Sequence, residues 1–168
     1  MDEINLVQKA KSGDKEAFCE LYMLYRDRLY RYAYYRLGNS EDAQDAVSST
    51  VVEAYQNISK LLNEKAFSGW LFKIHYRSCC SLIKEQSRQN NTEDIESLNK
   101  EAVTTINYDS TELNEALDIL GEEEREIVLL SAVAGYNSRE IADTMGLKHS
   151  TVRSKLSRSL SKMRKFLE

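Results

Sequence analysis

Apolar residues recur every three or four positions through the first half of the chain, and this spacing predicts four helices. Gly13 and Gly38 stand where two of these helices should end. Asp14 and Ser40 stand where the next ones should be capped. The expected helices span residues 3–12, 15–37, 41–62 and 66–88.

The last three of these helices each carry one apolar stripe, which should face a common core. The expected inward residues are Phe18, Leu21, Tyr22, Tyr25, Leu29, Tyr32, Ala33 and Arg36 in the second helix, Ala43, Ala46, Val47, Thr50, Val51, Ala54, Tyr55, Ile58 and Leu62 in the third, and Phe67, Trp70, Leu71, Ile74 and Leu82 in the fourth.

Further helical periodicity follows a polar stretch at residues 89–110. Leu113, Leu117 and Leu120 begin an apolar pattern that Gly121 interrupts, and a helix is expected from residues 122–124 to Val133. The next helix should be capped by Asn137 or Ser138, two residues that are common at helix N-termini. All predicted elements are therefore helical, and the chain contains no proline to break them.

The stretch SREIADTMGLKHSTVRSKLSRSL, residues 138–160, predicts a helix-turn-helix. Ala142 is small enough for two helices to approach closely, and Gly146 tolerates the positive φ that the turn needs. The second helix is expected from Ser150 to Phe166. The expected inward residues of the motif are Ile141, Met145, Leu147, Val152, Leu156 and Leu160.

Charge is unevenly distributed along a chain whose formal net charge is -4. Residues 1–90 carry a net charge of +1, residues 91–126 of -10 and residues 127–168 of +5. No acidic residue occurs from Leu147 to Leu167, whereas a solvated helix face normally mixes signs. A polyanion such as DNA fits this helix. Docking onto an acidic partner, or onto the chain's own acidic segment, is the alternative interpretation.

A mixture of aromatic and basic residues marks the helix predicted at 66–88. Trp70, Phe72 and Tyr76 alternate with Lys73, Arg77 and Lys84. Aromatic rings stack on unpaired bases and cations hold phosphates, so the mixture suits single-stranded DNA. An amphipathic helix that packs its rings inward would show the same residues.

Several other function classes find little support. Cys19, Cys79 and Cys80 form no disulfide framework or Cys-x-x-Cys pair, and only two histidines are present, so we expect no metal site or cofactor. His75 lacks an evident catalytic partner and no glycine-rich phosphate loop occurs, so an enzyme is not expected. The N-terminus has no signal-peptide character and no apolar run is long enough to span a membrane, which favours a cytoplasmic protein.

Taken in order, these segments resemble an extracytoplasmic-function sigma factor of bacterial RNA polymerase, a branch of the sigma-70 family. The resemblance to region 2 rests on GDKEAFCELYMLYRDRLYRYA, DAQDAVSSTVVEAYQNI and FSGWLFKIHYRS. The resemblance to region 4 rests on LGEEEREIVLLSAVAGYNSREIADTMGLKHSTVRSKLSRSLSKMR. Together, these two resemblances imply a subunit that binds core polymerase and recognises promoters. An anti-sigma factor becomes a candidate partner, and an autonomous helix-turn-helix repressor or activator is the alternative.

The resemblance also assigns roles to individual residues. Contact with the clamp helices of the largest polymerase subunit is implied for Asp42, Asp45, Ser48, Ser49 and Glu53. Contact with the minus-ten element is implied for Asn63, Lys65, Trp70, Phe72, Lys73, Tyr76, Arg77 and Lys84. Contact with the minus-thirty-five element is implied for Lys148, His149, Ser150, Thr151, Arg153, Ser154, Lys155, Ser157, Arg158 and Lys162.

Within the last group, Arg153, Ser154, Ser157 and Arg158 are the candidates for reading bases, whereas Lys148, Lys155 and Lys162 are assigned to phosphates. The chain departs from the usual pattern of the family at Ser48-Ser49, where Gln-Glu is common, at Arg77, where Asn is frequent, and at Ser81, where Asp is frequent.

We therefore expect an all-α protein with two small helical modules joined by a flexible acidic linker. The expected boundaries are 1–90 for the region 2-like module, 91–110 for the linker and 111–168 for the region 4-like module. The linker is interpreted either as a solvated tether that self-repulsion keeps extended, or as an imitation of nucleic acid that lies in a basic channel of a partner.

Overall fold

The computed structural model describes residues 2–92 and 111–168, and the elements of both ranges are helical. Its contacts divide the chain into two compact units, Met1–Val103 and Thr104–Glu168. Each unit has its own buried core, so each is described separately below. The segment interpreted as an acidic linker lies, from residue 93 to residue 110, outside the described residues.

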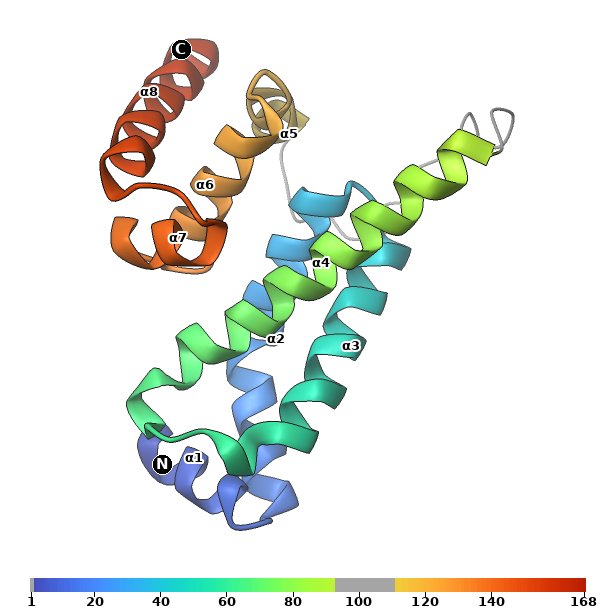
Figure 1. Cartoon of the computed structure of the whole chain (residues 1–168), viewed down its shortest axis with the longest axis vertical. Coiled ribbons are helices and arrows are strands. Elements are labelled where there is room, and N and C mark those ends of the chain that lie inside the picture. The colour runs from blue at the N-terminus through green and yellow to red at the C-terminus, as the bar shows by residue number, and fades with distance from the viewer. Residues whose placement is uncertain (1, 93–110) are drawn as a thin grey trace. The chain divides into compact units, whose positions relative to one another are not determined.

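Three long helices form the body of the first unit. They are α2 (Lys15–Leu37), α3 (Ser40–Asn57) and α4 (Phe67–Thr92), and each packs against the other two. The short helix α1 (Glu3–Lys11) packs on α2 and on the two 3₁₀ turns η1 (Ile58–Lys60) and η2 (Glu64–Ala66). Figure 1 shows α1 at the same end of the bundle as the connection between α3 and α4.

Aromatic residues fill the centre of this bundle, as the apolar stripes predict. Tyr32 and Phe72 are almost fully buried, and their rings meet edge to face with centroids 6.5 Å apart. Tyr25 contacts the Phe72 ring in the same way, and Phe67 packs beside Tyr25 at 5.4 Å. Edge-to-face pairs at such distances stabilise a core beyond the burial of their area.

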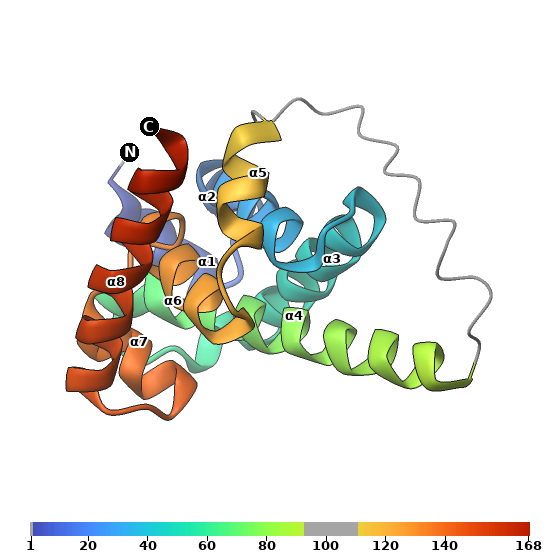
Figure 2. The same ribbon diagram turned by 90° about the horizontal axis from the view of Figure 1, so that it is seen from above.

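Some sequence expectations need correction in the first unit. Asn39, not Ser40, caps α3, since its side chain accepts from the backbone N–H of Asp42. That helix ends at Asn57, so Leu62 follows two short turns and is 95% exposed instead of inward. The helix α4 continues to Thr92, and Figure 2 shows its far end projecting past α2 and α3.

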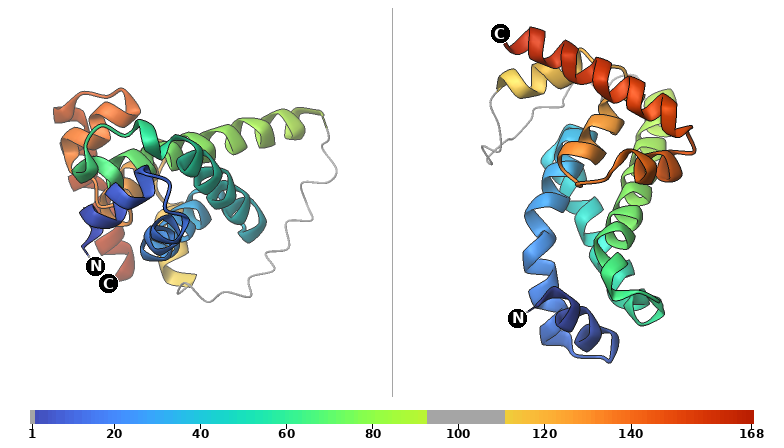
Figure 3. Two further views of the ribbon diagram at one scale, coloured as in Figure 1. Left: turned by 90° about the horizontal axis from the view of Figure 1, so that it is seen from below. Right: turned by 90° about the vertical axis from the view of Figure 1, so that its left-hand side faces the viewer.

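The second unit consists of α5 (Thr111–Asp118), α6 (Glu122–Ala132), α7 (Ser138–Met145) and α8 (His149–Leu167). The last helix packs against the other three, and the right-hand view of Figure 3 shows it lying along them. This arrangement, with α7 and α8 joined by a short turn, is the predicted helix-turn-helix.

Local signals explain where α7 begins and ends. Asn137 caps it, and Glu140 completes a capping box by accepting from the backbone N–H of Asn137 at 3.0 Å. Gly146 ends it in the left-handed conformation, with φ at 71°. A residue without Cβ adopts this conformation at no steric cost, so the predicted turn is confirmed.

The register of α8 differs slightly from the expectation. The helix begins at His149, one residue before the predicted Ser150, and its buried residues are Val152, Ser159 and Met163. Leu160 was expected inward, but it is 43% exposed because it lies beside this arc and not on it. Among the described residues, no helix is long and apolar enough to cross a membrane.

Candidate nucleic-acid interface

One face of α8 gathers the residues that were predicted to read bases. Arg153, Ser154, Ser157 and Arg158 are exposed, and together with Ser150 they line an open hollow on the helix surface. Their spacing of three and four residues places them on one side of the helix, away from Val152 and the rest of the buried arc. Two guanidinium groups on an exposed helix face suit the major groove, where arginine bonds guanine with two parallel hydrogen bonds.

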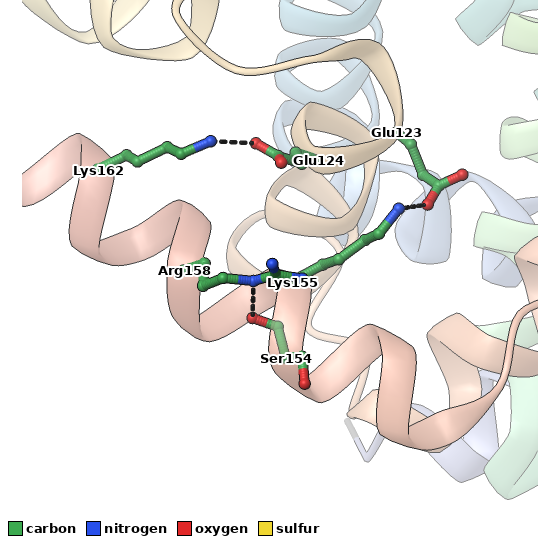
Figure 4. Close-up of polar contacts among 6 residues, drawn as sticks. All are labelled: Glu123, Glu124, Ser154, Lys155, Arg158 and Lys162. Atoms are coloured by element: carbon green, nitrogen blue, oxygen red, sulfur yellow. Dashed lines mark hydrogen bonds and ion pairs between the residues drawn. The ribbon is translucent and has the colours of Figure 1, made fainter.

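The lysines of α8 occupy a different position from these arginines. The ammonium group of Lys155 forms an ion pair with Glu123, and that of Lys162 lies 3.4 Å from the Glu124 carboxylate (Figure 4). Both acids belong to the first turn of α6, so the two pairs connect α6 to α8. From the sequence, both lysines are assigned to phosphates. The alternative interpretation, docking on the chain's own acidic segment, covers Glu123 and Glu124 but does not specify these two pairs.

The start of α8 provides further exposed polar groups. Lys148, His149 and Ser150 are exposed, and Thr151 is partly exposed. Lys148 occupies the N-cap position, and its side chain makes no capping bond. The partial positive charge of a helix N-terminus adds to these groups, and both favour an anion such as a phosphate.

On α4, the predicted cations form a single exposed stripe. Lys73, Arg77 and Lys84 are spaced by four and seven residues, which places them on the same helix face, and all three are exposed. Trp70 lies at the N-terminal end of this stripe, half-buried, with its ring 5.9 Å from that of Phe67. Arg77 also pairs with Glu53 of α3 at 3.7 Å.

Two predicted stacking residues are less available than Trp70. Phe72 is only 1% exposed and contacts Tyr25, Tyr32 and His75, so its ring belongs to the core and cannot stack on a base. We therefore remove Phe72 from the candidate DNA contacts. Tyr76 is half-buried, and its burial raises the pKa of its hydroxyl to about 12, with Cys80 adding to the effect.

The loop that precedes α4 is attached to the N-terminal helix. Lys11 of α1 pairs with Glu64 at 3.1 Å, and the pKa of that carboxyl is lowered by its backbone hydrogen bond and by Lys11. Asn63 caps η2 by accepting from the backbone N–H of Lys65. The side chains of Asn63 and Lys65 are themselves exposed, so a nucleic acid can reach both from solvent.

The predicted polymerase contacts on α3 divide into two groups. Asp45, Ser48 and Ser49 are exposed on the helix surface. Asp42 is partly buried and accepts hydrogen bonds from the side chains of Asn39 and Gln86, so it connects the start of α3 to α4. Asp42 therefore has a structural role in addition to the predicted one.

Sequence reasoning missed an apolar surface beside the α3 residues. Val52 is 55% exposed, and Tyr55, which was expected inward, is 46% exposed. Together with Phe18, Tyr22 and Val51 they line a hollow of about 430 Å³ between α2 and α3. Val52 lies seven residues after Asp45 and thus on the same helix face, a spacing that was visible in the sequence but was not used.

A buried polar network lies at the centre of the first unit. His75 is fully buried, with Nε2 2.6 Å from the carbonyl oxygen of Leu29 and Nδ1 2.7 Å from the hydroxyl of Thr50. Burial lowers the pKa of His75 to about 4, although the bond to Leu29 opposes the shift. The ring is therefore neutral near pH 7 and has a structural role. The described residues contain no group of His, Cys, Asp and Glu that could hold a metal ion.

Fold and site together define a two-module helical protein whose second module presents a basic helix-turn-helix. Comparison with protein families places sigma-70 region 2 at residues 21–89 and sigma-70 region 4 at residues 110–163. The first range lies within the first unit of the structure and the second range within the second unit.

The individual proteins that the chain is similar to are also sigma factors. The chain is 30% identical to the RNA polymerase sigma factor SigV of Bacillus subtilis, over 83% of this chain and 84% of that protein. It is 24% identical to SigW of the same organism, over 96% and 94% of the two chains. It is also 30% identical to SigE of Mycolicibacterium smegmatis, of whose length it spans 65%.

Solved structures show the same fold. The chain superposes on the sigma factor RpoE in complex with the anti-sigma factor NepR from Bartonella quintana, with a TM-score of 0.76, 22% identity, and coverage of 89% of this chain and 96% of that one. It superposes on CnrH in complex with the cytosolic domain of CnrY with a TM-score of 0.71, 22% identity, and coverage of 98% and 96%.

The chain belongs to the extracytoplasmic-function sigma factors of the sigma-70 family, with a region 2 and a region 4. Members of this family are not enzymes; they direct RNA polymerase to promoters.

Proposed function

We propose that α8 reads the minus-thirty-five element of the promoter from the major groove. The observation that carries this proposal is the separation of faces on α8: Arg153, Ser154, Ser157 and Arg158 are exposed on one side, and Val152, Ser159 and Met163 are buried on the other. A helix held in this way can present its polar face to base edges, while Lys148 and the helix N-terminus contact phosphates.

The loop 59–65 and the exposed stripe of α4 are proposed to bind and open the minus-ten element. Lys73, Arg77 and Lys84 would follow the phosphates of one strand, and Trp70 would stack on an unpaired base. Asn63 and Lys65 are exposed beside the start of α4 and would contact the same strand. Arg77 would exchange its pairing with Glu53 for a phosphate.

The exposed face of α3 is proposed to dock on the clamp helices of the largest polymerase subunit. Asp45, Ser48, Ser49 and Val52 share this face. It combines a carboxylate, two hydroxyls and an apolar side chain, a mixture that is common in protein interfaces. Asp42 and Glu53 flank this face.

An anti-sigma factor is a further proposed partner, because the similar RpoE chain was solved with one. Since core polymerase acts in the cytoplasm, the chain is proposed to act there as well.

The test is transcription by core polymerase reconstituted with the full chain on a library of promoter variants. Arg153→Ala should lower transcription from the preferred promoter about tenfold and flatten the preference at one or two minus-thirty-five positions, since a bidentate pair contributes about 1–3 kcal/mol of discrimination. Arg164→Ala, which removes an exposed cation from the last turn of α8, is the matched control and should leave the preference unchanged.

Two results would contradict the proposal. If Arg153→Ala scales every promoter by one common factor, Arg153 does not read bases. Sequence-specific binding by the chain alone, together with no stimulation of core polymerase, would instead favour an autonomous regulator.

A further inference from the structure

The first turn of α6 places two carboxylates opposite the two lysines of α8. Glu123 pairs with Lys155 and Glu124 with Lys162, and Figure 4 shows the two pairs side by side between the helices. The lysines are seven residues apart, which is two helical turns, so they lie on one face of α8. Two acids that are neighbours in the sequence of α6 thus pair with two lysines that are two turns apart on α8.

These pairs divide the cations of α8 into two classes. Lys155 and Lys162 each have a carboxylate partner in α6, whereas the Nε of Arg158 lies 3.4 Å from the carbonyl oxygen of Ser154 in its own helix. No ion pair of Arg153 or Arg158 occurs among the contacts described for residues 111–168, so both guanidinium charges can act on an external anion. The charges of Lys155 and Lys162 are partly neutralised by carboxylates that lie beside the proposed DNA-binding face.

The distinction matters because lysines and arginines contribute differently to DNA binding. A lysine on a phosphate strengthens binding to every sequence equally, and it makes binding more dependent on salt. An arginine on a base edge strengthens binding to a particular sequence. Contacts of the first kind add equally to the two affinities, so they leave the preference for a sequence unchanged and set how strongly the chain binds any DNA.

We propose that Glu123 and Glu124 neutralise Lys155 and Lys162 and so weaken sequence-independent binding of the chain to DNA. The proposal rests on α8 being the promoter-reading helix. Both pairs are partly exposed, with 30% and 43% of the side chains accessible for Lys155 and Glu123, and 54% and 26% for Lys162 and Glu124. Exposed ion pairs are weak, so each acid is expected to change the affinity for DNA only severalfold.

The experiment measures binding of the full chain to two fluorescent duplexes, one that carries the preferred promoter and one with the same bases scrambled, over a range of salt concentrations. Glu123→Gln and Glu124→Gln keep the size of the side chain and remove its charge. Glu122→Gln is the matched control: it changes the net charge equally in the same helical turn, and no ion pair of Glu122 occurs among the contacts described for residues 111–168.

Glu123→Gln and Glu124→Gln should each raise the affinity for the scrambled duplex about fivefold at low salt, which corresponds to the upper range for an exposed ion pair. Each should also steepen the dependence of log K on log salt by about 0.9, since one more lysine becomes available for a phosphate. The preference for the promoter duplex should stay unchanged, because the added phosphate contact strengthens binding to both duplexes equally. Glu122→Gln should produce less than half of either effect.

A second pair of variants separates this effect from a general change in charge or a loss of folding. In the wild-type background, Lys155→Ala should change the salt slope by less than about 0.3, whereas Lys148→Ala should lower it by about 0.9. Adding Lys155→Ala to Glu123→Gln should restore the wild-type slope. The intact α6–α8 packing of each variant is checked by hydrogen exchange of the amides in these helices.

The proposal is overturned if Glu122→Gln and Glu123→Gln change the slope equally, or if Lys155→Ala lowers it as much as Lys148→Ala. These outcomes leave the proposed function intact. That function would fail separately, if the wild-type chain gave no promoter-specific transcription with core polymerase.

Discussion

The hydroxyl of Thr50 in α3 lies 2.7 Å from Nδ1 of His75 in α4, and both side chains are fully buried. The carbonyl oxygen of Leu29 in α2 can only accept a hydrogen bond, so Nε2 of His75 carries the hydrogen that faces it. In the neutral ring Nδ1 is then an acceptor, and Thr50 donates to it. The same hydroxyl lies 2.7 Å from the carbonyl oxygen of Ala46, so its one hydrogen is shared between two acceptors.

This network makes the stability of the first unit depend on pH. Burial lowers the pKa of His75 from 6.5 to about 4. In the unfolded chain the ring takes up a proton as the pH falls below about 6.5, whereas the folded protein resists protonation until about pH 4. The stability associated with neutral His75 is thus fully present above pH 6.5 and is lost as the pH falls to 4, at a cost of about 3 kcal/mol.

His75→Gln should remove this part of the pH dependence while it keeps a donor for the Leu29 carbonyl. We expect the variant to be less stable than the wild type at pH 7 and to approach it as the pH falls towards 4. Urea unfolding followed by tryptophan fluorescence measures the effect in the first unit alone, because Trp70 is the only tryptophan in the chain. If the free energy of unfolding changed with pH in the same way in both proteins, His75 would not titrate as described.

Gly146→Ala should destabilise the helix-turn-helix by about 1–2 kcal/mol, because a side chain is strained at its φ of 71°. An added Cβ would meet nothing within 4 Å, so the cost comes from the backbone alone. Gly121→Ala is the control: its Cβ also meets nothing, and φ is an ordinary -65°, so the change should stay within about 0.5 kcal/mol. Hydrogen exchange of the α7 and α8 amides measures both effects, and equal protection in the two variants would contradict the strain argument.

Asp45→Arg should weaken association with core polymerase about tenfold or more if the α3 face is the docking surface, because a charge mismatch in an interface is costly. Asp45 is exposed, so the helical content should not change. Asp27→Arg makes the same substitution at an exposed position of α2 and should bind normally. Co-purification with core polymerase compares the variants, and normal recovery of Asp45→Arg would exclude this face.

Cys19 and Cys79 should differ in their reactivity towards iodoacetamide. Cys19 is exposed, whereas Cys79 is fully buried, and burial raises the pKa of the Cys79 thiol to about 12. Since the thiolate is the reactive form, Cys79 should react at least about 100-fold more slowly than Cys19 in the folded protein. Mass spectrometry of peptides after timed labelling measures the rates. In urea the two rates should become similar, and a fast reaction of Cys79 without urea would contradict the burial.

The helices were predictable from sequence because their apolar periodicity and caps are local signals. Residues such as Gly38, Gly146 and Asn137 act within one turn, so their effects are visible in the sequence. Contacts between distant segments were not visible. Phe72 appeared to be a stacking residue because its neighbours are basic, but the packing of α2 against α4 buries it.

Ion pairs between distant segments are likewise not visible in the sequence. The run without acids from Leu147 to Leu167 favours DNA as the partner of the lysines of α8, with docking onto the chain's own acidic segment as the alternative. Glu123 and Glu124 meet that helix only after α6 folds back against it, and periodicity within a single helix contains no information about this pairing. The exposed face that is proposed to read bases is a property of α8 alone, which is why it could be predicted.

The attachment of α1 to the loop before α4 affects how segments could be exchanged between relatives. The region 2 match begins at residue 21, yet Lys11 holds Glu64 and Glu3 accepts a hydrogen bond from Tyr25. A chimera cut at residue 21 would separate both contacts and combine a foreign first helix with this loop. Residues 3–66 should therefore be exchanged as a single segment, so that the first helix and the loop before α4 come from the same protein.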